Sequence, residues 1–520
     1  MQLGFVIDQT RCIGCHACTV ACKSENHVPV GSFRTWVKYT EVGEFPSVKR
    51  SFAVLRCNQC TDAPCVKICP TSALEKRPDG IVDVNPDHCI GCKSCMHGCP
   101  YDALYIGEDG TAEKCHFCAH RTTRGLAPAC AVVCPTEAIV PGDFDDPGSV
   151  VSRMKEELGL VARKSEAGTN PNVLYREAAP AGIDPNLALG TIGSGGQIWA
   201  DTHPGLDRRS EEFDAAANGA QMARSTYNVA HPALWGGKIT AYLFTKSVAA
   251  GVILAAMVSG AAPFWAGPEG ATLWERIGLP LVSLAFLVAT SLFLVFDLKR
   301  PERFLYILLR GNFSSWLVRG TWFLVAFGGL VSAWIGVEAA GIELVPAVRI
   351  GLASATGLAA ALAACYTGWL FGQAKGRVLW MRRGLFAHLI VQALVAGSAA
   401  LLLYGVAFDL PAELLATTSR TLMAWLGLHA IFTLVEGRMA PRKREVEYER
   451  THRLVSDGPF ARRHWRVGVG LGIILPLLLL AVPVGTLAQP FFLAAALLAL
   501  IGLYVEEDLL VRAGQALPIS

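Results

Sequence analysis

Hydrophobic and polar positions divide this chain into two parts that predict different kinds of structure. Up to about residue 141, apolar residues come in short pieces between polar, cysteine-rich loops. From residue 239 onwards they form long runs with few charged residues. We count eight runs, over residues 239–263, 277–296, 320–341, 350–371, 385–407, 421–435, 467–484 and 490–505. A helix needs about 20 apolar residues to cross a bilayer, so the second part predicts an all-α bundle of eight transmembrane helices.

The short apolar pieces of the first part predict strands. Phe5–Ile7, Phe52–Leu55 and Ile81–Val84 are candidates, and each precedes a cysteine-rich loop. Residues 142–230 are different, because only 150–161 has the period of an amphipathic helix and the rest is rich in Pro, Gly, Ala and Asn. We expect an extended connector there, lying on a partner or on the first part.

Composition supports this division. The chain has 520 residues, of which 52% are hydrophobic and 17% charged, whereas a soluble protein of average composition has about 25% charged residues. Basic residues stand between the apolar runs and not on a globular face with interleaved aromatic residues. That distribution excludes the usual pattern of a nucleic-acid-binding protein.

Lysine and arginine also predict the orientation of the bundle. With eight spans, both chain ends lie on the same side of the membrane. The loops on that side, residues 297–319, 372–384 and 436–466, contain 18 Lys and Arg residues, against 3 in the opposite loops. The positive-inside rule then places the first part in the cytoplasm, and a start without a secretory or twin-arginine signal agrees. Alternatively, the basic loops dock the first part.

Sixteen of the seventeen cysteines lie between residues 12 and 134, in four groups of four. The groups are Cys12, Cys15, Cys18 and Cys22; Cys57, Cys60, Cys65 and Cys69; Cys89, Cys92, Cys95 and Cys99; and Cys115, Cys118, Cys130 and Cys134. The first and third have the spacing C-x2-C-x2-C-x3-C, which is typical of bacterial ferredoxins. The second widens one gap, and the fourth has an eleven-residue loop before Cys130.

This spacing indicates four [4Fe–4S] clusters. A tight loop can direct three thiolates at one cube, and the fourth cysteine of such a motif ligates the other cluster of the pair. A disulfide framework suits a small secreted chain instead, and zinc sites use paired C-x2-C units without a third cysteine. Thiolates that hold iron also fit a reducing compartment. We therefore expect an α+β ferredoxin-like four-cluster domain over residues 1–141, the connector over 142–230 and the membrane domain over 231–520.

The combination resembles the electron-transfer arm of the complex iron–sulfur molybdoenzyme family. The cysteine pattern is similar to that of the four-cluster subunit, and the second part resembles the NrfD/PsrC (polysulfide reductase) type of membrane anchor. The anchor is recognised by D-L-K-R-P-E-R-F at 297–304 and S-W-L-V-R-G at 315–320. The two subunits are usually separate chains, so this chain resembles a fusion of both.

The resemblance implies that ligands are shared in crossed pairs. Cys12, Cys15 and Cys18 would share a cluster with Cys134; Cys115, Cys118 and Cys130 with Cys22; Cys57, Cys60 and Cys65 with Cys99; and Cys89, Cys92 and Cys95 with Cys69. The clusters would then carry electrons between a catalytic site and the membrane. It further implies an anchor without haem that reacts directly with quinone, either menaquinone or ubiquinone.

A quinone pocket would lie at the membrane face beneath the cluster domain. Seven ionisable residues of the spans fall on that side and are our candidates for binding quinone: Tyr242, Lys246, Asp297, Arg319, His388, His429 and Glu436. Ionisable groups within spans are costly and usually functional. Each also has a simpler interpretation, since Lys246 can extend to the interface, Tyr242 can belong to the aromatic belt, and Asp297 can pair with Arg319.

Three further residues have open interpretations. His388 and His429 could instead be axial ligands of a b-type haem. Glu338, near the opposite face, belongs either to a proton route or to the headgroup layer. Cys365 is interpreted as a small packing residue.

We expect an electron-transfer and membrane-anchor subunit of a quinone-linked oxidoreductase. Catalysis on the other substrate would belong to a molybdopterin-containing partner, because this chain shows no such site of its own. The alternative is a module of a quinol:acceptor oxidoreductase with proton translocation and a cytochrome partner. A third possibility is an anchor that tethers the clusters without a quinone site.

Overall fold

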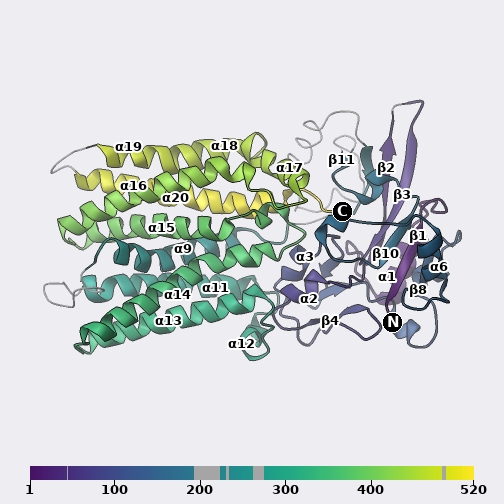
Figure 1. Ribbon diagram of the computed structural model, residues 1–520, viewed down its shortest axis with the longest axis horizontal. Coiled ribbons are helices and arrows are strands. Elements are labelled where there is room, and N and C mark those ends of the chain that lie inside the picture. Colours follow the sequence, from purple (N-terminus) through teal and green to yellow (C-terminus); the bar gives the residue numbers. More distant parts are fainter. Residues whose placement is uncertain (44, 192–222, 230–232, 262–273, 483–487) are drawn as a thin grey trace.

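The computed structural model of the protein describes residues 1–43, 45–191, 223–229, 233–261, 274–482 and 488–520. Part of the predicted connector, residues 192–222, lies outside the described residues, as do the ends of the first and seventh predicted spans. A strand-rich, cysteine-bearing domain stands at one end of a long helical bundle (Figure 1). This confirms the order of the two parts.

The cysteine-bearing domain is built from short elements, as its short apolar pieces predicted. These are β1 (Leu3–Asp8), α1 (Ala17–Asn26), β2 (Thr35–Val42), β3 (Lys49–Arg56), α2 (Pro64–Ile68), β4 (Leu74–Lys76), β5 (Val82–Val84), α3 (Ser94–Gly98), β6 (Leu104–Ile106), β7 (Ala112–Lys114), α4 (Ala119–Thr122), α5 (Ala129–Val132) and β8 (Ile139–Asp143). All three predicted strands form, as β1, β3 and β5. The β4–β5 and β6–β7 hairpins follow the second and third cysteine groups, so the repeat in sequence becomes a repeat in structure.

Residues beyond 141 complete the sheets of this domain. They form α6 (Val150–Glu157), β9 (Val161–Ala162), η1 (Ser165–Ala167), β10 (Val173–Arg176), α7 (Pro180–Ile183), β11 (Ala188–Thr191) and β12 (Ala223–Tyr227). One sheet has the order β8–β1–β10–β9, with β10 parallel to β1, and the other has the order β11–β12–β2–β3. The described parts of the expected connector are thus hydrogen-bonded into the cysteine-bearing domain. The amphipathic helix forms but ends at Glu157, just before the weak helix former Gly159.

The bundle contains the long helices and several short ones between them. They are α9 (Gly237–Val258), η2 (Trp274–Gly278), α11 (Leu279–Asp297), η3 (Pro301–Arg303), α12 (Tyr306–Leu309), α13 (Trp316–Ala339), α14 (Pro346–Gly372), η4 (Val378–Met381), α15 (Leu385–Ala407), α16 (Ala412–Val435), η5 (Glu436–Arg438), α17 (Glu445–Ser456), α18 (Ala461–Arg463), η6 (His464–Ile474), α19 (Leu475–Ala481) and α20 (Ala488–Ala516). α9 and α15 pack against each other at the centre of the bundle.

Six helices of the described chain are long and apolar enough to cross a membrane. They span Gly237–Val258, Arg276–Asp297, Trp316–Ala339, Pro346–Gly372, Leu385–Ala407 and Ala461–Ala481. The sixth and eighth predicted spans form helices, α16 and α20, that pack against α15 in the same bundle (Figure 1). They are not among the six, and both carry charged residues, such as Glu413 in α16 and Glu506 in α20. Eight spans therefore stay a prediction.

The two parts of the molecule share one hydrophobic core. Buried residues of the second and third cysteine groups belong to the same cluster as buried residues of the bundle. At the junction, Trp235 stacks on Trp380 with ring centroids 5.4 Å apart, and His97 of α3 packs on Trp235 at 4.1 Å. The cysteine-bearing domain is therefore held directly against the end of the bundle.

Candidate functional site

The cysteine side chains are mostly enclosed by the domain. All seventeen cysteines of the chain are free thiols, and among the four groups only Cys15 is exposed, with Cys12, Cys92 and Cys134 half-buried. Disulfide bonds therefore do not hold this domain together. Burial, followed by the charges of Cys115 and neighbouring thiolates, raises the pKa of the Cys22 thiol well above its ordinary value. Such thiols need a positive partner to ionise.

Cysteines of different groups face common spaces. One small cavity is lined by Cys69 of the second group and by Cys89, Cys92 and Cys95 of the third. Another is lined by Cys22 of the first group and by Cys115, Cys118 and Cys130 of the fourth. In both, three neighbouring cysteines meet the last cysteine of another group, which is the arrangement expected from the resemblance.

In the two remaining sets, which contain Cys60 and Cys12, the proximity of cysteines from different groups is seen in the effect of their charges on one another. Burial, then the charges of Cys57, Cys65 and Cys99, raises the pKa of Cys60. For Cys12, burial raises the pKa most, and the Cys134 thiolate adds to the shift. The charges around Cys60 thus come from its own group and from Cys99, the last cysteine of the third group, and Cys12 likewise lies near Cys134, the last cysteine of the fourth group.

Hydrogen-bond donors surround the sulfur atoms. The N–H of Ala112 donates to Cys89 Sγ at 3.3 Å, and that of Ala138 donates to Cys134 Sγ at 3.2 Å. The fully buried Arg56 donates from Nη1 to Cys130 Sγ at 3.3 Å. Donors of this kind stabilise anionic sulfur in a buried site.

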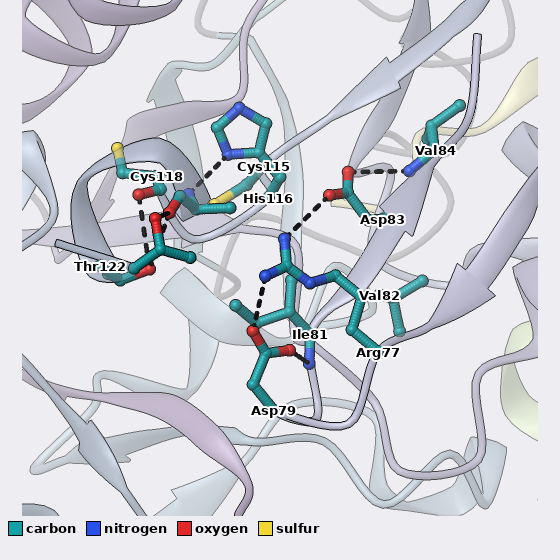
Figure 2. Close-up of polar contacts among 12 residues, drawn as sticks. Arg77, Asp79, Ile81, Val82, Asp83, Val84, Cys115, His116, Cys118 and Thr122 are labelled. Atoms are coloured by element: carbon teal, nitrogen blue, oxygen red, sulfur yellow. Dashed lines mark hydrogen bonds and ion pairs between the residues drawn. The ribbon is translucent and has the colours of Figure 1, made fainter. Parts of the chain in front are cut away.

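Local turns direct the fourth cysteine group. Figure 2 shows His116 between Cys115 and Cys118, with its Nδ1 accepting a hydrogen bond from the N–H of Ala119 at 3.2 Å. Cys118 has a φ of 50°, in the left-handed region, and its carbonyl accepts from the Thr122 hydroxyl at 3.5 Å. The chain turns between the two cysteines, and both line the cavity that Cys22 also lines.

These residues fit [4Fe–4S] clusters in ligand number, burial and surrounding donors. Within the described residues, no three His, Cys, Asp or Glu side chains are placed to hold one metal ion. In a cube each thiolate binds a different iron atom, so the sulfurs need not converge on one point. The Cys69 and Cys22 cavities are the clearest places for two of the clusters.

The 297–304 signature attaches the bundle to the third cysteine loop. The backbone N–H groups of Lys299 and Arg300 donate to the carbonyls of Gly91 and Ile90 at 3.3 and 3.2 Å. Gly91 permits this contact, because a Cβ there would lie 2.5 Å from Lys299 Cβ. Arg303 also donates to the carbonyl of Cys89 at 3.0 Å. Some of the basic loop residues therefore bind the cysteine-bearing domain. Docking of this kind was the other explanation for the basic loops, beside the positive-inside rule.

An apolar cavity of about 340 Å³ opens beside this junction. Its walls come from α9, α11, α12, α13 and α14, with Cys92 of the third cysteine group at one end. Most lining residues are Leu, Val, Ile or Phe, and the polar ones are Tyr242, Ser291, Asp297, Thr321, Tyr366 and Thr367. A single space thus joins the third cysteine loop to the interior of the bundle.

Three of the seven candidates lie at or below this cavity. Tyr242 and Asp297 line it, and Tyr242 OH bonds both Tyr366 OH and Thr367 Oγ1. Lys246 is one turn deeper on α9, where its Nζ donates to the Ala364 carbonyl at 2.5 Å. Tyr242 and Asp297 thus supply polar groups to the cavity wall, and Lys246 lies behind Tyr242.

The other four candidates lie elsewhere. Arg319 donates to the Phe313 carbonyl at an exposed position, and Asp297 pairs with Lys93 of the cysteine-bearing domain instead. His388, His429 and Glu436 form a separate buried network around Arg382, which bonds both His388 Nδ1 and Glu436. The alternative pairing of Asp297 with Arg319 is therefore wrong.

The histidine pair is bonded to itself. His388 Nε2 and His429 Nδ1 are 2.8 Å apart, so no iron atom fits between the two rings. This arrangement disfavours the b-type haem alternative. Glu338 is also paired, since Arg349 donates to it at 2.9 Å in a buried position.

Several residues of these sites were missed from the sequence. Tyr366 interrupts the apolar run 350–371 and Arg382 stands just before the run 385–407. These positions could have identified both residues as candidates. Glu507 stands just beyond the predicted end of the eighth span, within the acidic stretch Glu506-Glu507-Asp508, and it is fully buried. Lys93 gave no signal, because its partner Asp297 is 204 positions away.

Known families match both parts of the chain. Residues 226–518 match the family described as "Polysulphide reductase, NrfD", and residues 48–144 match a "4Fe-4S dicluster domain".

Individual relatives match the cysteine-bearing part. The arsenate respiratory reductase iron–sulfur subunit of Shewanella sp. strain ANA-3 is 38% identical over 224 residues, covering 34% of this chain and 96% of the relative. A polysulfide reductase subunit of Wolinella succinogenes is 40% identical over 187 residues, covering 35% and 98%. A putative dimethyl sulfoxide reductase iron–sulfur subunit of Halobacterium salinarum is 40% identical over 203 residues, covering 33% and 78%.

Proposed function

Since this chain belongs to the NrfD polysulphide reductase family and carries an iron–sulfur electron-transfer domain ahead of its membrane domain, we propose that it connects a molybdopterin-containing catalytic partner to quinone in the membrane. Its sixteen grouped cysteines would hold four [4Fe–4S] clusters in the crossed sets described above. Relatives of the first part are iron–sulfur subunits of reductases, which supports a catalytic site on a partner chain.

The observation that carries this proposal is the cavity between Cys92 and Tyr242. Its volume of about 340 Å³ falls in the range of ligand pockets, which are mostly apolar with a few polar groups. A quinone has the same character, with two carbonyl oxygens on an apolar ring and tail. The ring would lie at the end near Cys92, and the tail would extend along α11 and α13.

The residues around the cavity have distinct roles in this proposal. When bound, the four clusters supply a path for single electrons, whereas a quinone exchanges two electrons and two protons. The hydroxyls of Tyr242 and Tyr366 can donate hydrogen bonds to a quinone carbonyl. The leucine and valine side chains of α11 and α13 exclude water, and the Lys93–Asp297 pair keeps the third cysteine loop against the cavity.

Two neighbouring glycines provide a direct test of the cavity. Gly328 lines it, and a Cβ there would lie 3.1 Å from Leu287, whereas Gly329 has open space around its Cβ position. In the purified, cluster-loaded chain, Gly328→Leu should raise the menaquinol or ubiquinol concentration needed for half-maximal cluster reduction by about tenfold. Gly329→Leu is the matched control and should behave as the parent protein. Equal behaviour of the two variants, or no reduction of the parent protein by either quinol, would refute the quinone site.

The partner and the orientation are proposals of the same kind. Isolation of the native complex should give a molybdenum-containing chain bound to this one, and the absence of such a chain would refute the proposed partner.

We place the cluster domain on the cytoplasmic side of the inner membrane, with eight spans, because the basic residues are concentrated in the loops on that side. A cysteine introduced at the exposed Val446 of α17 should then react with impermeant reagents only in inverted vesicles. Labelling in intact cells would put the clusters in the periplasm.

A further inference from the structure

A lysine and a glutamate are buried together in the bundle beneath the tyrosines of the cavity. Lys246 on α9 is 1% exposed and Glu507 on α20 is fully buried. Ionisable side chains in such a position are costly and usually mark a functional path. We propose that Glu507 and Lys246 supply protons to the tyrosine pair of the cavity. This rests on the proposed function, in which the cavity takes quinone.

Lys246 lies against both tyrosines. Its Nζ is 5.4 Å from the ring centroid of Tyr366 and 6.0 Å from that of Tyr242. The hydrogen bond to the Ala364 carbonyl occupies one of the three N–H groups of its ammonium. Lys246 lies one helical turn from Tyr242 on α9 and is not among the residues that line the cavity, so it stands behind the residues that would touch a quinone.

Glu507 stands behind Lys246. Ser247, the next residue on α9, donates its hydroxyl to Glu507 Oε1 at 2.9 Å. Oε2 of the same carboxyl group is buried without a hydrogen-bond partner among the described residues. When it is ionised, Glu507 is also the side chain whose charge acts most strongly on Lys246. The carboxyl group is thus held in place by one oxygen while the other is left for a proton.

The tyrosines connect this pair to the cavity. Tyr242 and Tyr366 share a hydroxyl-to-hydroxyl hydrogen bond, and both side chains line the cavity wall. A proton released from a tyrosine hydroxyl can therefore be replaced from the protein interior, without opening the cavity to water. The order along the path is Glu507, Lys246, the tyrosine pair and then the cavity.

The outer end of the path points toward solvent. Asp508, the residue after Glu507, accepts hydrogen bonds from Arg463 at 2.9 Å and Arg512 at 2.7 Å. Both arginine side chains are about half exposed, at 47% and 51%. Asp508 thus lies next to Glu507 in the sequence and contacts two arginines that reach solvent, and Glu507 would regain its proton from this side.

The reaction balances with these groups. A quinone that becomes a quinol takes two electrons, delivered one at a time from reduced [4Fe–4S] clusters, and two protons. Each O–H bond forms at a carbonyl oxygen as the O–H bond of Tyr242 breaks. The phenolate regains its proton from the Lys246 ammonium group, and Lys246 regains one from Glu507. Quinol oxidation follows the same route in reverse, with the clusters as electron acceptors.

The test uses the full, cluster-loaded chain in lipid nanodiscs and the rate at which menaquinol reduces the clusters. Glu507→Gln keeps the shape and the Ser247 hydrogen bond but cannot carry the proton. Its limiting rate at saturating quinol should fall about tenfold or more, with a larger solvent isotope effect. The quinol concentration at half-saturation should stay within about twofold. Dithionite should still reduce the clusters to the same spectrum.

Neighbouring variants separate the relay from a structural role. Glu506→Gln is the matched control, because Glu506 bonds His464 of η6 and not a residue of the proposed path, so its limiting rate should be unchanged. Glu507→Asp should recover part of the rate. A Glu507→Gln protein with the limiting rate and isotope effect of the parent would overturn the inference. Failure of the parent protein to react with quinol would refute the proposed function instead.

Discussion

Lys93 donates from its Nζ to Asp297 Oδ2 at 3.0 Å, and this ion pair connects the cysteine-bearing domain to the bundle. Lys93 follows the cluster-ligand candidate Cys92, and Asp297 ends α11 at the wall of the cavity. Both side chains are largely buried, at 9% and 12% exposed. The charge next to a proposed cluster and the charge beside the proposed quinone site therefore neutralise each other.

Removing the lysine should weaken the junction. Lys93→Met leaves the Asp297 carboxylate without its counter-charge, and loss of one partner of a buried pair costs about 3–5 kcal/mol. We expect a lower midpoint for thermal loss of the cluster absorbance and slower reduction of the clusters by quinol. Lys67→Met, at an exposed position, is the control and should change neither. Identical melting of the Lys93 variant and the parent would contradict a stabilising role.

Two cysteine variants should reveal the order of the clusters. Cys69 belongs to the set that contains Cys92, next to the cavity. Cys134 is expected to share a set with Cys12, and the elements beside these two cysteines, β1, α1 and β8, lie at the end of the domain far from the bundle (Figure 1). Cys69→Ala should abolish reduction of the remaining clusters by quinol while dithionite still reduces them. Cys134→Ala should leave quinol reduction of the other three intact. Electron paramagnetic resonance and iron content, for which we expect sixteen atoms in the parent, measure both effects.

Arg56 should raise the reduction potential of a neighbouring cluster. Arg56 is fully buried and donates to Cys130 Sγ. Burial raises the pKa of the Cys18 thiol to about 11, and the positive charge of Arg56 opposes this shift. Because a reduced cluster is more negative, the loss of this donor disfavours reduction. Arg56→Met should therefore shift one midpoint potential downward, on the order of tens of millivolts.

Redox titration followed by electron paramagnetic resonance measures that shift. Arg77→Met is the control, because Arg77 pairs with Asp79 and Asp83 at the edge of the β4–β5 hairpin (Figure 2). Its potentials should match those of the parent. An unchanged set of potentials in the Arg56 variant would show that this arginine serves packing alone.

Lys38 should make stability depend on pH. Burial, followed by the charges of Arg163, Arg450 and Lys164, lowers the pKa of Lys38 to about 7, against about 10.4 in an unfolded chain. Below pH 7 the folded protein carries the full cost of the buried charge. As pH rises from 7 to about 10.4, only the unfolded chain keeps the proton, so the stability contribution rises.

Replacing this lysine should remove that dependence. Lys38→Met should raise the thermal midpoint most at pH 6, and the gain should shrink as pH approaches 10. Lys49→Met, at an exposed site in β3, should show no such trend. A gain that is constant from pH 6 to pH 10 would mean that Lys38 does not titrate in the folded protein.

Local sequence patterns were enough to predict the segments of this protein. The spacing of the cysteines, the short apolar pieces and the long apolar runs each act over a few residues, since a strand, a turn or a helix depends mainly on its own neighbours. For that reason β1, β3, β5 and the six candidate spans could be placed from the sequence. The expected cluster ligands likewise came from spacing, because short gaps such as C-x2-C bring neighbouring thiols together within one loop.

Contacts between distant segments could not be predicted in this way. Asp297 pairs with Lys93 and not with Arg319, His388 bonds His429, and Ser247 on α9 bonds Glu507 on α20. Each contact depends on which helix faces meet when the bundle packs and on where the cysteine-bearing domain docks. Such choices are made by burial and shape over the whole core, where a buried charge must find a partner wherever the fold brings one within reach.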